Sequence, residues 1–125
     1  MTPSSLFAFA GAGSVGALAR WFLVAQLQER WPGLPWPVAV VNVLGCFCFG
    51  VCWSFGDGRW SPATSAVVLS GFFGAFTTFS SFAFDCHRLL AEGRLGLLCV
   101  NVLGQNLLGL GGLAVGITLG LRLAR

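Results

Sequence analysis

The sequence predicts an all-α membrane protein made of four transmembrane helices. Of its 125 residues, 56% are hydrophobic and only 9% are charged, and the mean hydropathy is +0.83. Soluble domains carry about 25% charged residues, and a single small globular core could not bury this much apolar surface. A disordered chain is excluded as well, because disordered chains have low hydrophobicity. A net charge of +3 without a basic cluster also excludes a nucleic-acid-binding surface.

Four long intervals without any charged residue set the number of helices. A membrane helix needs about 20 mostly apolar residues to cross the hydrocarbon layer, and each interval is long enough to supply one. The intervals are Met1–Ala19, Trp31–Gly56, Trp60–Phe84 and Leu95–Leu121. Their apolar residues run continuously rather than alternating, which favours helices over the closed β-barrel that is the other way to span a membrane.

The turn-forming residues between these intervals define the approximate spans of a single domain, 1–125. We expect the helices at residues 4–27, 36–55, 62–90 and 95–121. Residues 31–35 form the first connection because Pro32 and Pro35 cannot continue a helix. Residues 56–59 form the second connection, and Pro62 suits the first turn of the third helix, where a missing N–H costs little. Residues 92–94 make the third loop.

The third span carries the most informative segment, Gly71-Phe-Phe-Gly-Ala-Phe-Thr-Thr-Phe-Ser-Ser-Phe82. Hydroxyl side chains can satisfy freed backbone groups, so this helix can break near its middle where protein surrounds it. A break exposes carbonyls, which suit Na⁺, and N–H groups, which favour anions. Phe79 and Phe82 share one helical face, and Phe76 is expected on nearly the same stripe. Such a stripe either packs against neighbouring helices or turns its electropositive ring edges to a narrow path, where they hold a small anion weakly enough to release it.

The arginines are distributed evenly between the two expected sides of the membrane. One side receives Arg59, Arg122 and Arg125, and the other receives Arg30, Arg88 and Arg94. Three against three leaves no positive-inside bias to orient the chain. We therefore expect insertion in both orientations and an antiparallel homodimer with its two-fold axis in the membrane plane.

Larger polar side chains inside the spans are the next candidates for function. Arg20 either extends to the membrane interface or faces inward, where it fixes the fold or lends positive potential to an aqueous vestibule. Asn42 either forms an interhelical hydrogen bond or donates N–H to an anion in a pore. Asn101 and Gln105 lie one turn apart and give the fourth helix a polar stripe.

Carboxylates are missing from the middle of every expected span, since Asp85 lies near the end of the third. Proton-coupled transporters normally place a titratable carboxylate in the membrane, so the sequence favours a passive pathway. His87 is expected near the interface. The five cysteines contain no C-x-x-C pair and are expected to act as small apolar residues.

The chain resembles the Fluc (CrcB-type) fluoride channel family. The resemblance covers nearly the whole chain and rests on Gly16-x-x-x-Arg20, Val41-Asn42-x-x-Gly45-x-Phe47-x-x-Gly50 and the Gly71–Phe82 segment. It implies an antiparallel dual-topology homodimer in the cell inner (plasma) membrane. It also implies two pores, a structural Na⁺ at the dimer centre, and export of F⁻ from the cytoplasm that confers fluoride resistance.

Functional residues follow from this resemblance position by position. It implies a fluoride pore formed by Asn42, Phe79, Phe82, Thr78, Ser81, Asn101 and Gln105. The carbonyls of Gly74 and Thr77 would hold Na⁺, and Arg20 would support the vestibule. The chain departs from the family pattern at Pro37-Val38 and Cys46. Asn101 and Gln105 stand where a Tyr and a Ser are usual, and the chain has no Tyr.

The resulting hypothesis is a passive fluoride-selective channel, not an enzyme. Two other classes stay open at this point. A small four-helix proton-coupled multidrug exporter would share the length and dual topology, but it needs a Glu embedded in the membrane. A non-transporting membrane subunit would be supported only by the glycine-rich packing surfaces.

Overall fold

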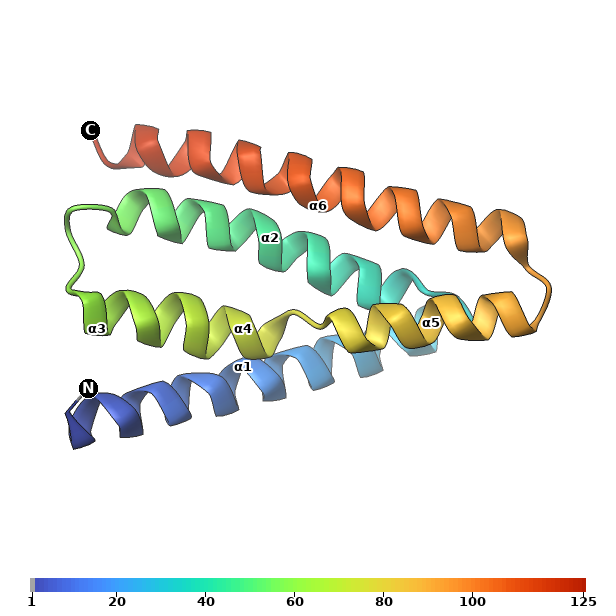
Figure 1. The fold of residues 1–125 in the computed structure, drawn as a ribbon, viewed down its shortest axis with the longest axis horizontal. Coiled ribbons are helices and arrows are strands. Elements are labelled where there is room, and N and C mark those ends of the chain that lie inside the picture. The colour runs from blue at the N-terminus through green and yellow to red at the C-terminus, as the bar shows by residue number, and fades with distance from the viewer. Residues whose placement is uncertain (1) are drawn as a thin grey trace.

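Residues 2–125 are described by a computed structural model, in which four long helical rods run side by side (Figure 1). The first, second and fourth rods are α1 (Pro3–Arg30), α2 (Trp36–Gly56) and α6 (Leu95–Leu123). The third comprises α3 (Pro62–Ser65), the π-helical η1 (Ala66–Phe73), α4 (Gly74–Phe76) and α5 (Phe79–Ala91).

All four rods are long and apolar enough to cross a membrane. No strand occurs within residues 2–125, and many large apolar side chains on the outside of the rods are exposed, as lipid contact requires. The prediction of an all-helical protein with four spans is confirmed. The chain is a multi-pass membrane protein.

The third rod begins where the sequence places its proline. Ser61 precedes Pro62, and its hydroxyl oxygen accepts the Thr64 N–H at 3.1 Å. A Ser cap followed by Pro in the first turn is a favourable helix start, because both features compensate for N–H groups without intrahelical partners. The winding of η1 as a π-helix was not predicted, since an apolar run looks the same for either kind of winding.

The helices pack in two unequal pairs. The most extensive contact joins α2 to α6, while α1 packs mainly on η1 and α4. Both chain ends lie at the same end of the bundle as the α2–α3 turn (Figure 1). Arg59 and Arg122 are therefore at one end of the bundle, and Arg30 and Arg94 are at the other, as the sequence indicated.

Glycines allow the closest helix approaches. A Cβ atom at Gly116 of α6 would collide with the Phe47 carbonyl oxygen of α2, and one at Gly16 of α1 would collide with the Phe72 carbonyl oxygen of η1. Small residues at such contacts let backbones come together inside a bilayer, where packing rather than the hydrophobic effect drives helix association.

We predict that Gly116→Ala destabilises the protein, because the added methyl group must push α6 away from α2. Overpacking of this kind costs about 1–3 kcal/mol. Thermal unfolding of the purified protein in detergent, followed by circular dichroism, measures the effect. Gly111→Ala is the matched control, since a Cβ there meets nothing within 4 Å. Equal melting temperatures for the two variants would contradict the prediction.

Candidate functional site

The third rod is interrupted at two threonines near its middle, as the sequence predicts. α4 ends at Phe76, and the next two residues are extended, with φ −84° and ψ 157° at Thr77 and φ −148° and ψ 112° at Thr78. The Thr77 hydroxyl and backbone N–H both donate to the Phe73 carbonyl at 3.0 Å. The Thr78 hydroxyl oxygen accepts the Ser81 N–H at 3.2 Å and caps α5. One threonine therefore closes the first half-helix, and the other starts the second.

Asn42 of α2 satisfies the backbone of the break. Its Oδ1 accepts the Thr78 N–H at 2.8 Å, and its Nδ2 donates to the Thr78 carbonyl at 3.1 Å. A backbone polar group left unpaired in hydrocarbon costs several kcal/mol. This single carboxamide therefore supplies both partners that Thr78 loses when the helix stops. Gly45, one turn further along α2, leaves the space that Thr77 and Phe76 fill.

Arg20 of α1 points to the break rather than to a membrane interface. Its Nε donates to the Ala75 carbonyl at 3.0 Å, which lies at the end of α4, where the helix dipole is negative. Arg20 also lines a cleft of about 410 Å³ together with Gln28, Thr78 and Ser81. Of the two alternatives for this residue, its inward orientation is the one observed.

The break leaves backbone carbonyls without donors. Neither the Gly74 nor the Thr77 carbonyl accepts a hydrogen bond from residues 2–125, and Gly74 is exposed with open space around it. Unpaired carbonyl oxygens are hard ligands of the kind Na⁺ takes in broken membrane helices, so these two carbonyls fit the predicted ion. Among the same residues, no group of three or more His, Cys, Asp or Glu side chains could hold a metal.

Phe79 and Phe82 form the aromatic wall of a second cleft. Their ring centroids are 5.5 Å apart and tilted by 50°, and the cleft of about 140 Å³ is also lined by Asn42, Gln105 and Asn106. Phe79 is 79% exposed in the single chain. The cleft therefore combines ring surface with amide groups and contains no charged side chain.

The expectation for Phe76 was wrong. Its ring is buried and stacks on Phe72, with centroids 5.7 Å apart and an interplanar angle of 10°. The stripe argument assumed an unbroken helix through Phe76, Phe79 and Phe82. The extended Thr77 and Thr78 change the direction of the chain, so Phe76 belongs to the packed first half and not to the cleft.

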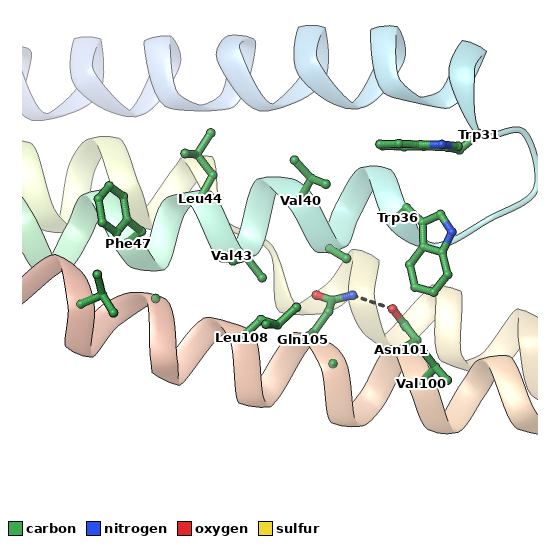
Figure 2. A pocket seen from close by; sticks show the side chains of 14 residues that line it. Trp31, Trp36, Val40, Val43, Leu44, Phe47, Val100, Asn101, Gln105 and Leu108 are labelled. Carbon is green, nitrogen blue, oxygen red and sulfur yellow. Dashed lines mark hydrogen bonds between the residues drawn. The ribbon is translucent and has the colours of Figure 1, made fainter.

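The polar stripe on α6 is present and reaches α2. Gln105 Nε2 donates to Asn101 Oδ1 at 2.9 Å, and Gln105 Oε1 accepts from Asn42 Nδ2 at 3.0 Å. Figure 2 shows Gln105 and Asn101 along an apolar groove of about 790 Å³ between α2 and α6, which has Trp31 and Trp36 near one end. Asn101 is only 1% exposed.

The structure divides the predicted pore residues among three surfaces of one chain. Asn42, Gln105 and the two phenylalanines share the aromatic cleft, and Thr78 and Ser81 face the Arg20 cleft. Asn101 lies in the α2–α6 groove, which Gln105 also lines. Asn106 lines the aromatic cleft but was not among the predicted pore residues. It is one residue beyond the Asn101–Gln105 face, so the one-turn spacing that selected those residues could not select it.

These features define a multi-pass membrane protein in which a helix broken at mid-length is held by polar side chains from two neighbouring helices. The sequence model of the family described as CrcB-like protein, Camphor Resistance (CrcB), matches residues 6–117. The chain belongs to this CrcB-like family.

Relatives with similar sequences carry a functional name. The fluoride-specific ion channel FluC of Solidesulfovibrio magneticus is 44% identical over 87% of this chain and 90% of its own length. The fluoride-specific ion channel FluC of Nitrosococcus oceani is 41% identical over 90% of both chains. The protein of the same name from Nitratidesulfovibrio vulgaris is 42% identical over 87% of this chain and 90% of its own.

We predict that Thr78→Val destabilises the protein by about 1 kcal/mol, the usual cost of losing a helix N-cap. Valine has nearly the same shape but cannot accept the Ser81 N–H. Thr78→Ser keeps the hydroxyl and should melt close to the unaltered protein, whereas equal destabilisation by both would contradict the capping role. Thermal unfolding in detergent measures the difference. Thr118→Val on α6 controls for loss of a hydroxyl that only bonds its own helix.

Proposed function

We propose that the chain forms a passive, fluoride-selective ion channel that exports F⁻ from the cytoplasm and confers fluoride resistance. The observation that carries the proposal is the aromatic cleft beside the helix break, in a chain whose similar relatives are named fluoride-specific ion channels. The activity is transport and not catalysis.

The chemistry of the cleft suits a small anion that must also be released. Fluoride is heavily hydrated, so a pathway has to replace several water donors at once. Amide N–H groups of the cleft and the electropositive edges of Phe79 and Phe82 are such donors, and Thr78 and Ser81 add hydroxyls to the Arg20 cleft. A full positive charge in the cleft would bind fluoride too tightly for conduction.

The complete pore belongs to an antiparallel homodimer in this proposal. Phe79 is 79% exposed and Gly74 is open on the same rod, so a second chain would cover both and enclose the cleft. The even division of arginines between the ends of the bundle supports insertion in both orientations. A two-fold axis in the membrane plane then gives two equivalent pores.

Sodium is the proposed structural ion of this dimer. The unpartnered Gly74 and Thr77 carbonyls from two chains would supply its oxygen ligands at the dimer centre. In such a dimer the ion would balance the negative ends of two α4 segments brought together at the axis. The proposed location is the cell inner (plasma) membrane, where export of F⁻ protects cytoplasmic enzymes.

A proton-coupled multidrug exporter is not favoured. The buried acid Asp85 is paired with Arg88 at 3.1 Å, and it lies on α5, away from the aromatic cleft. No carboxylate lines any of the clefts described above. A non-transporting membrane subunit would need no cleft lined by polar groups. That alternative predicts no flux from the purified protein.

The flux experiment is direct. Liposomes that contain the purified protein and are loaded with fluoride should release F⁻, which an ion-selective electrode measures. The same liposomes loaded with chloride should not release Cl⁻. Phe79→Ile and Phe82→Ile should reduce fluoride flux about tenfold or more, because an aliphatic group has no electropositive edge. Phe84→Ile is the matched control, since Phe84 lies on α5 but does not line the cleft. Chloride passing as fast as fluoride would reject the selectivity.

The assembly makes a separate prediction. With a cleavable tag after Arg125, protease acting from either side of the membrane should remove the tag from part of the protein in cells. Cleavage from one side only would reject dual topology. Replacing Na⁺ by N-methylglucamine should lower the temperature at which the detergent-solubilised dimer dissociates, because the facing carbonyls then lose their cation. Gel filtration after heating measures dissociation. Unchanged dissociation without Na⁺ or K⁺ would remove the ion from the proposal.

A further inference from the structure

A chain of carboxamide hydrogen bonds extends from the helix break through α2 to α6. It starts at the Thr78 N–H, which donates to Asn42 Oδ1 at 2.8 Å. A backbone N–H can only donate, so the oxygen of Asn42 has to face it, and the NH₂ group of Asn42 is fixed on the other side. That group donates to the Thr78 carbonyl at 3.1 Å and to Gln105 Oε1 at 3.0 Å.

The same direction continues along α6 and into α5. With its oxygen facing Asn42, Gln105 presents Nε2 to Asn101 Oδ1 at 2.9 Å. Asn101 in turn donates its Nδ2 to the Cys86 sulfur at 3.4 Å. One backbone N–H at the break therefore sets the orientation of three side-chain amides in a row.

Counting hydrogens shows which amides remain available in the aromatic cleft. An NH₂ group carries two hydrogens, and Asn42 uses both. Gln105 uses one on Asn101, and Asn106 uses one on the Val102 carbonyl at 2.7 Å. Within residues 2–125, the amides that line the cleft and keep a hydrogen without an acceptor are therefore those of Gln105 and Asn106.

We propose that Gln105 and Asn106 donate the amide hydrogens that meet the anion beside Phe79 and Phe82, and that Asn101 is a positioning residue for Gln105. This inference rests on the proposed channel function and assigns the ion's donors within it. Asn42 then acts through Thr78, by holding the break, and not through a hydrogen of its own.

Asn101 positions Gln105 because it holds the nitrogen end of the Gln105 amide, while Asn42 holds the oxygen end. It is 1% exposed and does not line the aromatic cleft, so it has no direct access to an ion there. Its oxygen receives the Gln105 N–H, and its NH₂ group is held by Cys86. Without this acceptor only the contact of its oxygen with Asn42 orients the Gln105 amide, and the nitrogen that offers its second hydrogen to the cleft is no longer held.

The donor assignment is tested by fluoride efflux from liposomes as a function of fluoride concentration. Gln105→Met preserves the side-chain length but removes the amide, and Asn106→Leu removes the second donor. Each should lower the flux about tenfold or more, since a hydrogen bond to a charged group is among the stronger ones. Leu107→Met on the same helix is the control and should conduct normally. Asn106 is exposed, so N106L tests the idea even if Gln105→Met prevents folding.

The positioning role is tested by two substitutions at one site. In so apolar a position a carboxylic acid stays neutral, so N101D keeps an oxygen for Gln105 and gains an O–H for Cys86. N101D should retain most of the flux, whereas Asn101→Leu should lose it about tenfold. A role in packing alone predicts the reverse, because leucine fits an apolar site better than a carboxyl group. Gel filtration confirms that each variant is still a dimer.

The outcomes separate the inference from the channel function. No fluoride flux from the unaltered protein would reject the channel and the inference together. Normal flux from the unaltered protein, Gln105→Met and N106L alike would leave the channel function standing and overturn the donor assignment. Equal flux from N101D and Asn101→Leu would overturn the positioning role of Asn101.

Discussion

The pairing of the Asn42 carboxamide with the backbone of Thr78 is the interaction on which the rest of the site depends. In hydrocarbon, a helix can stop only where something else satisfies the N–H and carbonyl groups that it frees. Here one side chain from α2 pairs with both the N–H and the carbonyl of Thr78. Without it, the third rod would have to continue as a helix or admit water at this depth.

Several features follow from that one pairing. The break moves Phe79 and Phe82 out of the register of the first half-helix, which is why Phe76 packs inward while the other two rings form a cleft. The break that this pairing stabilises also frees carbonyls, and the Ala75 carbonyl accepts a hydrogen bond from Arg20 Nε. The pairing itself fixes the direction of the amide hydrogen bonds that continue to Gln105. A structural requirement of the bilayer is thus converted into an oriented set of donors and acceptors.

The spans and the approximate position of the break were predictable because both depend on local composition. Long charge-free runs have to be buried in lipid, and the Thr77-Thr78 pair carries the hydroxyls that end one half-helix and cap the next. The membership of the clefts was less predictable. Thr78 and Ser81 face the Arg20 cleft, while Asn106 joins the aromatic cleft, because helical spacing gives neighbours on one helix and not which neighbouring helix each face meets.

By itself the sequence determined that the chain crosses a membrane four times, that its third helix is interrupted, and that it resembles a known channel family. These conclusions rest on the cost of placing charge or unpaired backbone in lipid, which each segment carries independently. Only the tertiary structure decided that Asn42 holds the break and that Gln105, 63 residues further along the chain, contacts Asn42. Such pairings depend on the rotation and height of packed helices, which arise from close contacts such as that of Gly116 with Phe47.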